Sequence, residues 1–141
     1  MIWTSERNRQ QGELVAEIYR GAAAVPCERL AIIAGGLPGA DKARALDEAG
    51  VDRSRYLTVS IDDVLIRMAA RQLIPSADAD GLSPLARAGR VHGEAQFLAK
   101  RVALLALTDG RNLILDISLA SWRAAGMARA QMASARRYRP P

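Results

Sequence analysis

Residues 30–49 read LAIIAGGLPGADKARALDEA, and they set the architecture of the chain. The first five, Leu30 to Ala34, form a short apolar run that ends at Gly35-Gly36, a pattern typical of a buried parallel strand entering a tight turn. A helix is predicted to follow from about Lys42 to Ala49. A strand, a glycine-rich turn and a helix in this order indicate a parallel α/β sheet, because parallel strands are joined by crossover helices.

Strand and helix patterns alternate along the rest of the chain. Tyr56 to Ile61 is rich in strand formers, and apolar residues resume helical spacing from Val64. Ser83-Pro84 is a plausible cap and first turn for a helix that is expected to stop at Gly110. We predict strands over 30–34, 56–61 and 113–115, an N-terminal helix containing residues 14–22, and a last helix over about 119–137.

These elements predict a single domain. The chain has 141 residues and a mass of 15.2 kDa, which suits one hydrophobic core. We expect a three-layer α/β fold in which a short parallel sheet of about three strands is flanked by helices. Its parts are an N-terminal helix over 1–28, an α/β core over 29–118, and a basic C-terminal helix and tail over 119–141.

Positive charge is concentrated at the C-terminus. Residues 117–141 contain five Arg and no acidic residue, which accounts for the net charge of +5. Such a tail can contact phosphates, or it can be a solvated helix face. Few aromatic residues interleave with these arginines and no nucleic-acid-binding motif is present, so we favour the solvated face and expect no nucleic-acid partner.

One cysteine, Cys27, and one histidine, His92, exclude an internal disulfide and a Cys/His metal cluster formed by this chain alone. The N-terminus lacks the apolar stretch of a signal peptide, and no apolar run approaches the roughly 20 residues of a membrane span. We therefore expect a soluble protein of the reducing cytoplasm.

The predicted strand ends carry the candidate chemistry. Ligands of an open parallel sheet bind outside the carboxyl ends of its strands. The three strands end in Gly35-Gly36, Asp62-Asp63 and Asp116. A glycine turn and two acidic positions at one edge suit a phosphate and a divalent cation. Each of these acids could instead simply cap the helix that follows it.

The glycine turn has the spacing of a phosphate-binding P-loop. Residues 36–43 read GLPGADKA, against the pattern G-x-x-x-x-G-K-[ST]. In that loop, backbone amides hold phosphates, Lys neutralises them and the hydroxyl binds Mg²⁺. Asp41 replaces the second glycine and Ala43 replaces the hydroxyl residue, and both changes oppose nucleotide binding. A glycine-rich turn can also serve only close packing.

Four stretches of the chain resemble the zeta-toxin family of P-loop kinases, which is similar to chloramphenicol phosphotransferase. The matches run in order from about Leu30 to Ser121. They are Gly35-Gly36-Leu37-Pro38-Gly39 with Lys42, Ile61-Asp62-Asp63-Val64, His92-Gly93-Glu94-Ala95, and Gly110-Arg111-Asn112-Leu113-Ile114-Leu115-Asp116-Ile117-Ser118. The combination is far more specific than any one part.

The resemblance implies a phosphotransferase that uses ATP and Mg²⁺, with uridine-diphosphate-N-acetylglucosamine and related sugar nucleotides as the family's acceptors. On this basis Asp62 would accept the proton of the acceptor hydroxyl, and Lys42 would hold the transferred phosphates. Asp116 and Ser118 would help to hold Mg²⁺. Residues near the acceptor would be Asp63, His92 and Glu94. Nucleotide-binding residues would be Gly35, Gly36, Pro38, Gly39, Ala40, Asp41, Lys42 and Ala43.

The chain also departs from the family pattern. It stops where the family continues with further strands, a lid and the arginines that clamp the γ-phosphate. Loss of an arginine of this kind costs roughly 10³ or more in rate. The alternative interpretation is therefore a non-catalytic pseudokinase that acts as a protein-interaction or toxin–antitoxin regulatory module.

The strand over 30–34 is expected to lie at an edge of the sheet when those later strands are missing. A bare apolar edge invites pairing with another chain unless a helix covers it. We therefore expect a homodimer, or a complex with a partner protein, formed through this strand.

Overall fold

The structure is a computed structural model that describes residues 3–34, 42–74 and 83–116. Its elements are, in order, α1 (Ser5–Arg20), β1 (Ala31–Ala34), α2 (Lys42–Glu48), the 3₁₀ helix η1 (Arg53–Arg55), β2 (Leu57–Ser60), α3 (Ile61–Ala70), α4 (Pro84–Asp109) and β3 (Leu113–Asp116). The expected α/β class is confirmed. The last helix, expected over about 119–137, lies outside the described residues.

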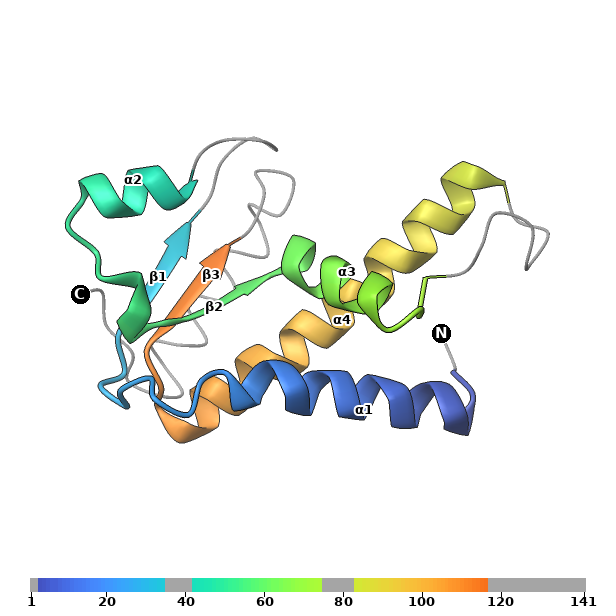
Figure 1. Ribbon diagram of the computed structural model, residues 1–141, viewed down its shortest axis with the longest axis horizontal. Coiled ribbons are helices and arrows are strands. Elements are labelled where there is room, and N and C mark those ends of the chain that lie inside the picture. The colour runs from blue at the N-terminus through green and yellow to red at the C-terminus, as the bar shows by residue number, and fades with distance from the viewer. Residues whose placement is uncertain (1–2, 35–41, 75–82, 117–141) are drawn as a thin grey trace.

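A parallel sheet of three strands, in the order β1-β3-β2, forms the middle of the fold. Residues 31–34 of β1 and 57–60 of β2 both pair with residues 113–116 of β3, so the three strands begin and end together. Figure 1 shows α1 and α4 on one side of the sheet and α2 on the other. Within the described sheet β1 is an edge strand, as expected.

Capping residues set where the helices begin and end. Thr4 caps α1 by accepting a hydrogen bond from the backbone N–H of Arg7, so the helix begins well before the apolar stretch that predicted it. Ser83 caps α4 in the same way, and Gly110 ends it in the left-handed conformation at φ 74°, as predicted. The helix α3 begins at Ile61, earlier than the predicted start near Val64, because Ser60 caps it.

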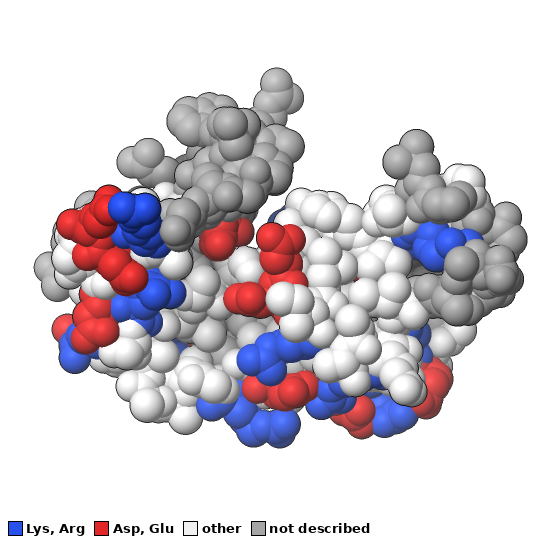
Figure 2. All heavy atoms as spheres, turned by 45° about the horizontal axis from the view of Figure 1, so that its top comes forward, with Lys and Arg blue, Asp and Glu red and all other residues white. Residues whose placement is uncertain are grey.

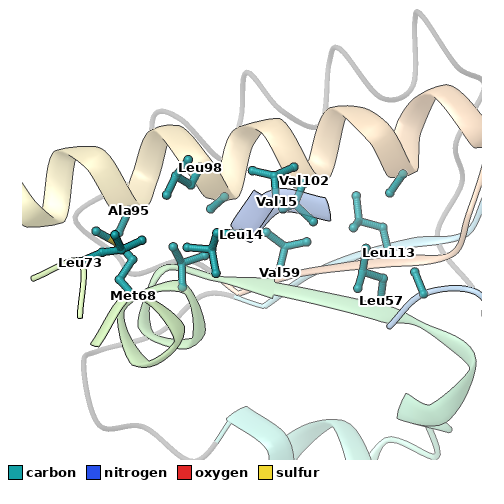
Figure 3. Close-up of a cluster of buried hydrophobic side chains, with 14 of the residues drawn as sticks. Leu14, Val15, Leu57, Val59, Met68, Leu73, Ala95, Leu98, Val102 and Leu113 are labelled. Atoms are coloured by element: carbon teal, nitrogen blue, oxygen red, sulfur yellow. The ribbon is translucent and has the colours of Figure 1, made fainter. Parts of the chain in front are cut away.

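The hydrophobic core lies between the sheet and the pair α1 and α4, and extends along α3. Odd-numbered strand residues such as Leu57, Val59 and Leu113 face this core, since side chains alternate between the two faces of a strand. Figure 3 shows them meeting Leu14 and Val15 of α1, Leu98 and Val102 of α4, and Met68 of α3. The core thus fixes the position of α3 relative to the end of β2.

Asn112 ties the amino ends of all three strands together. It is fully buried, and its side-chain oxygen accepts hydrogen bonds from the backbone N–H groups of Glu28 (3.1 Å) and Leu30 (3.2 Å). Its amide nitrogen donates to the Glu28 carboxylate at 2.9 Å, and its backbone oxygen accepts from the N–H of Leu57. Every polar group of Asn112 is therefore used in aligning the sheet, which explains an asparagine in an apolar setting.

Candidate functional site

Two of the three predicted positions for site chemistry, Asp116 and the pair Asp62-Asp63, lie on neighbouring elements at the carboxyl end of the sheet. Asp116 of the central strand is in register with Ala34 of β1 on one side and with Ser60 of β2 on the other. Neighbouring strands lie about 4.8 Å apart, so Asp116 stands between the end of β1 at Ala34 and the start of α3 after Ser60. Parallel pairing in register is what brings these distant parts of the sequence together.

The first turn of α3 carries Asp62 and Asp63. Ser60 is the residue that caps this helix, since its hydroxyl oxygen accepts a hydrogen bond from the backbone N–H of Asp63 at 3.0 Å. The interpretation of these two acids as the caps of α3 is therefore wrong. Both side chains are exposed, and within residues 3–34, 42–74 and 83–116 neither carboxylate has a hydrogen bond or an ion pair. Figure 2 shows acidic side chains gathered where β2 passes into α3, with basic ones beside them.

The predicted phosphate loop falls mostly outside the described residues. Those residues are Gly35, Gly36, Pro38, Gly39, Ala40 and Asp41, and Ser118 is outside as well. Lys42 is the first residue of α2, as predicted. The described residues on either side of residues 35–41 are Ala34, which ends β1 beside Asp116, and Lys42, which begins α2.

His92 and Glu94 both lie on α4, in different environments. His92 is exposed, whereas Glu94 is only 4 % exposed. The carboxylate of Glu94 accepts two hydrogen bonds from the Arg7 guanidinium, at 2.7 and 2.5 Å, and one from the Gln11 amide at 2.7 Å. Arg7 also donates to the backbone oxygen of Leu73 at 2.6 Å. This cluster joins α1 and α4 to the chain just after α3.

Glu94 is charged in the folded protein despite its burial. Burial by itself raises the pKa of Glu94, but the hydrogen bonds from Arg7 and Gln11 and the positive charge of Arg7 outweigh it, and the net pKa lies below its ordinary value. Arg7, which binds Glu94, also binds Leu73 beyond the C-terminal end of α3, whereas Asp62 lies in the first turn of that helix. At 1.5 Å rise per residue, the helix from Asp62 to its last residue spans roughly 12 Å. The structure therefore does not bring Glu94 together with Asp62 and Asp63, and its role at an acceptor stays a prediction.

A pocket opens beside β2, next to the acidic turn. Its volume is about 170 Å³, and it lies between the end of α1, the edge of β2 that faces away from β3, and the first two turns of α3. Apolar side chains line much of it, and Asp63 and Arg67 add opposite charges from the same helix. The lining residues are Ile18, Gly21, Leu57, Thr58, Val59, Ser60, Asp63, Val64, Arg67 and Val102.

Several of these structural roles were missed by the sequence reasoning. Arg7 and Gln11 precede Leu14 and Val15 at helical spacing, so they occupy the stripe of α1 that faces the core. Polar residues on a buried stripe indicate a buried polar partner, and that signal was available in the sequence. No comparable pattern pointed to Arg67 or to the pocket, because the pocket forms where four separate elements, α1, β2, α3 and α4, meet.

Among the described residues, no three His, Cys, Asp or Glu side chains are grouped as they would be to hold a metal ion. Nor does any helix in that part of the chain combine the length and the hydropathy that a bilayer crossing requires. Comparisons of this chain with protein-family models, with curated proteins and with solved structures find no match.

Proposed function

We propose that the carboxyl end of this sheet binds a nucleoside triphosphate and transfers its terminal phosphoryl group to the hydroxyl of a small molecule or sugar nucleotide, as in a P-loop kinase. The observation that carries this proposal is the register of β1 with β3. In P-loop enzymes the phosphate-binding loop follows one strand, and the acid that holds Mg²⁺ lies next to the end of that strand. Asp116 has that position next to the strand that leads into Gly35-Gly36 and Lys42.

The donor set suits Mg²⁺ as well as a phosphate. Mg²⁺ prefers oxygen ligands and is commonly held by one or two carboxylates together with substrate phosphates. Asp116 would supply a carboxylate and Ser118 a hydroxyl oxygen, and when bound the ion would neutralise charge on the phosphates. Lys42, at the start of α2, would neutralise the transferred group.

Asp62 is the proposed base of the transfer step. It would take the proton of the acceptor hydroxyl while the hydroxyl oxygen forms a bond to the terminal phosphorus and the bond to the leaving diphosphate oxygen breaks. Its carboxylate is exposed in the first turn of α3, and among the residues the structure describes it has no competing partner. That availability supports this role, since a carboxylate already paired with a cation would be a weaker base.

A second candidate function is a non-catalytic interaction module. Asp41 and Ala43 remove features that phosphate and metal binding need, and β1 is an edge strand of the described sheet. A protein of this kind would keep the fold, would bind nucleotide weakly or not at all, and would pair with another chain.

Calorimetry with Mg-ATP distinguishes these two functions. If the phosphate site is functional, the wild type binds Mg-ATP and Lys42→Ala weakens binding by about tenfold or more, because a charge-assisted contact is lost. Lys100→Ala is the matched control, since Lys100 is exposed on α4 and is the other lysine of the chain. The affinity of the Lys100→Ala variant for Mg-ATP should equal that of the wild type.

Restoring the motif provides the converse test. The double variant Asp41→Gly, Ala43→Ser recreates the full P-loop pattern and should bind Mg-ATP more tightly than the wild type. Absence of binding at millimolar ATP in both proteins would overturn the phosphotransferase proposal and favour the interaction module.

A further inference from the structure

The pocket beside β2 combines an apolar interior with two opposite charges at its mouth. Ile18, Val64 and Val102 contribute aliphatic surface from three different helices. Asp63 and Arg67 lie four residues apart on α3, so their side chains leave the same face of the helix. A volume of about 170 Å³ suits one aliphatic or aromatic side chain, since a cavity of about 150 Å³ holds benzene.

The two charges at the mouth do not neutralise each other. No ion pair joins Asp63 to Arg67 in the described structure, although the i,i+4 spacing permits one. Arg67 instead has one long contact, 3.4 Å from its Nη1 to Oε1 of Glu17 on α1. The carboxylate of Asp63 is therefore available to a cation, and Arg67 has further N–H donors for an anion.

The edge of β2 adds a hydrogen-bond donor and an acceptor. The N–H of Leu57 donates to the backbone oxygen of Asn112, so Leu57 faces β3. Backbone groups alternate in direction along a strand, so those of Thr58 point to the opposite side, along the pocket. Over the part of the chain that the structure describes, no hydrogen bond to these groups of Thr58 is present.

We propose that this pocket binds a free α-amino acid with an apolar side chain. The ammonium group would pair with Asp63, the carboxylate with Arg67, and the side chain would enter the apolar interior. A zwitterion adds no net charge to the pocket. It offers a cation to Asp63, which has no partner among the described residues, and an anion to the N–H donors of Arg67 that Glu17 does not occupy. The inference does not rest on nucleotide binding, so it can fail or succeed independently of the proposed function.

The test is titration of ¹⁵N-labelled full-length protein with leucine and with phenylalanine, followed by NMR. Changes in amide chemical shift should be concentrated in residues 57–67. Binding should saturate at a millimolar or lower concentration of the amino acid. Three analogues of leucine define the recognised groups: 4-methylpentanoate lacks the amine, isoamylamine lacks the carboxylate, and N-acetyl-leucinamide lacks both charges. Each should bind about tenfold more weakly or worse, since each loses at least one charge-assisted hydrogen bond.

Variants of α3 link the binding to the pocket. Asp63→Asn and Arg67→Gln should each weaken leucine binding by about tenfold. Arg71→Gln is the matched control, because Arg71 also pairs with Glu17, at 2.8 Å, but does not line the pocket. It should leave the affinity within about twofold of wild type.

Three outcomes would overturn the proposal. One is no shift in residues 57–67 at saturating leucine. A second is equal loss of binding in the Arg71 and Arg67 variants, which would show a general effect on the α1–α3 contact. The third is equal binding of N-acetyl-leucinamide, which would show that the strand edge recognises a peptide backbone instead of a free amino acid. The amide spectrum of each variant shows directly whether it is folded.

Discussion

Glu94 illustrates how the neighbours of a buried acid determine its charge. Its pKa is lowered on folding, so the pairing with Arg7 stabilises the protein at pH values above the ordinary Glu value of 4.5. That stabilisation is lost as the pH falls through the pKa of the folded state. Glu94→Gln should lower the free energy of unfolding by about 2 to 4 kcal/mol at pH 7, because it leaves the Arg7 guanidinium without its counter-charge.

The difference in the free energy of unfolding between the wild type and Glu94→Gln should therefore shrink as the pH is lowered from 7 toward 3. Urea titrations of both proteins across that range measure it. Glu48→Gln is the control, because its pair with Arg44 is solvent-exposed on both sides and should contribute little at any pH. A difference that stays constant with pH would contradict a charged Glu94 in the folded state.

At the scale of elements, the turn from α4 into β3 depends on Gly110. Its φ of 74° is left-handed, and a Cβ there would lie 3.2 Å from Cγ and Nε of Arg29. Gly110→Ala should therefore destabilise the protein by about 1 kcal/mol or more. Gly93→Ala, in the exposed middle of α4 with nothing within 4 Å of the new Cβ, should instead stabilise it by about 0.5 to 1 kcal/mol.

Thermal unfolding of the two glycine variants measures this contrast within one helix. The opposite signs are the informative result, since both substitutions add the same methyl group. Destabilisation of similar size at both positions would mean that the left-handed turn is not what Gly110 provides.

At the scale of the whole molecule, β1 is an edge strand of the described sheet, and we predict that it pairs with a second copy. Leu30 directs its backbone oxygen to β3, so alternation directs the N–H groups of Ala31 and Ile33 outward. Antiparallel pairing of two copies about Ile32 would place Ala31 of one opposite Ile33 of the other, and would join the two sheets. We predict a dimer, with twice the chain mass of 15.2 kDa in light scattering at micromolar concentration.

Proline substitution separates the two edges of the sheet. Ile33→Pro removes an outward N–H and should give a monomer, while Thr58→Pro removes an outward N–H from the opposite edge and should leave the dimer intact. A monomeric mass for the wild type would contradict the pairing predicted here.

Local sequence patterns determined most of the described elements. Apolar runs marked β1, β2 and β3, and Ser83 with Gly110 marked both ends of α4, because strand burial and helix capping act over a few neighbouring residues. The start of α1 was not predicted, since its first half is polar. The position of Asp116 at the end of β3 followed from the same local patterns, whereas Asp62, expected directly after a strand, lies in the first turn of α3.

Tertiary structure decided which of these residues meet. Register with β3 places Asp116 between the ends of β1 and β2, and helix packing places Glu94 against Arg7, away from Asp62. The pocket with Asp63 and Arg67 exists only because α1 and α3 pack beside the same edge of β2. Periodicity along a chain records which face of an element is buried, but the identity of the neighbour on that face is set by packing between distant segments.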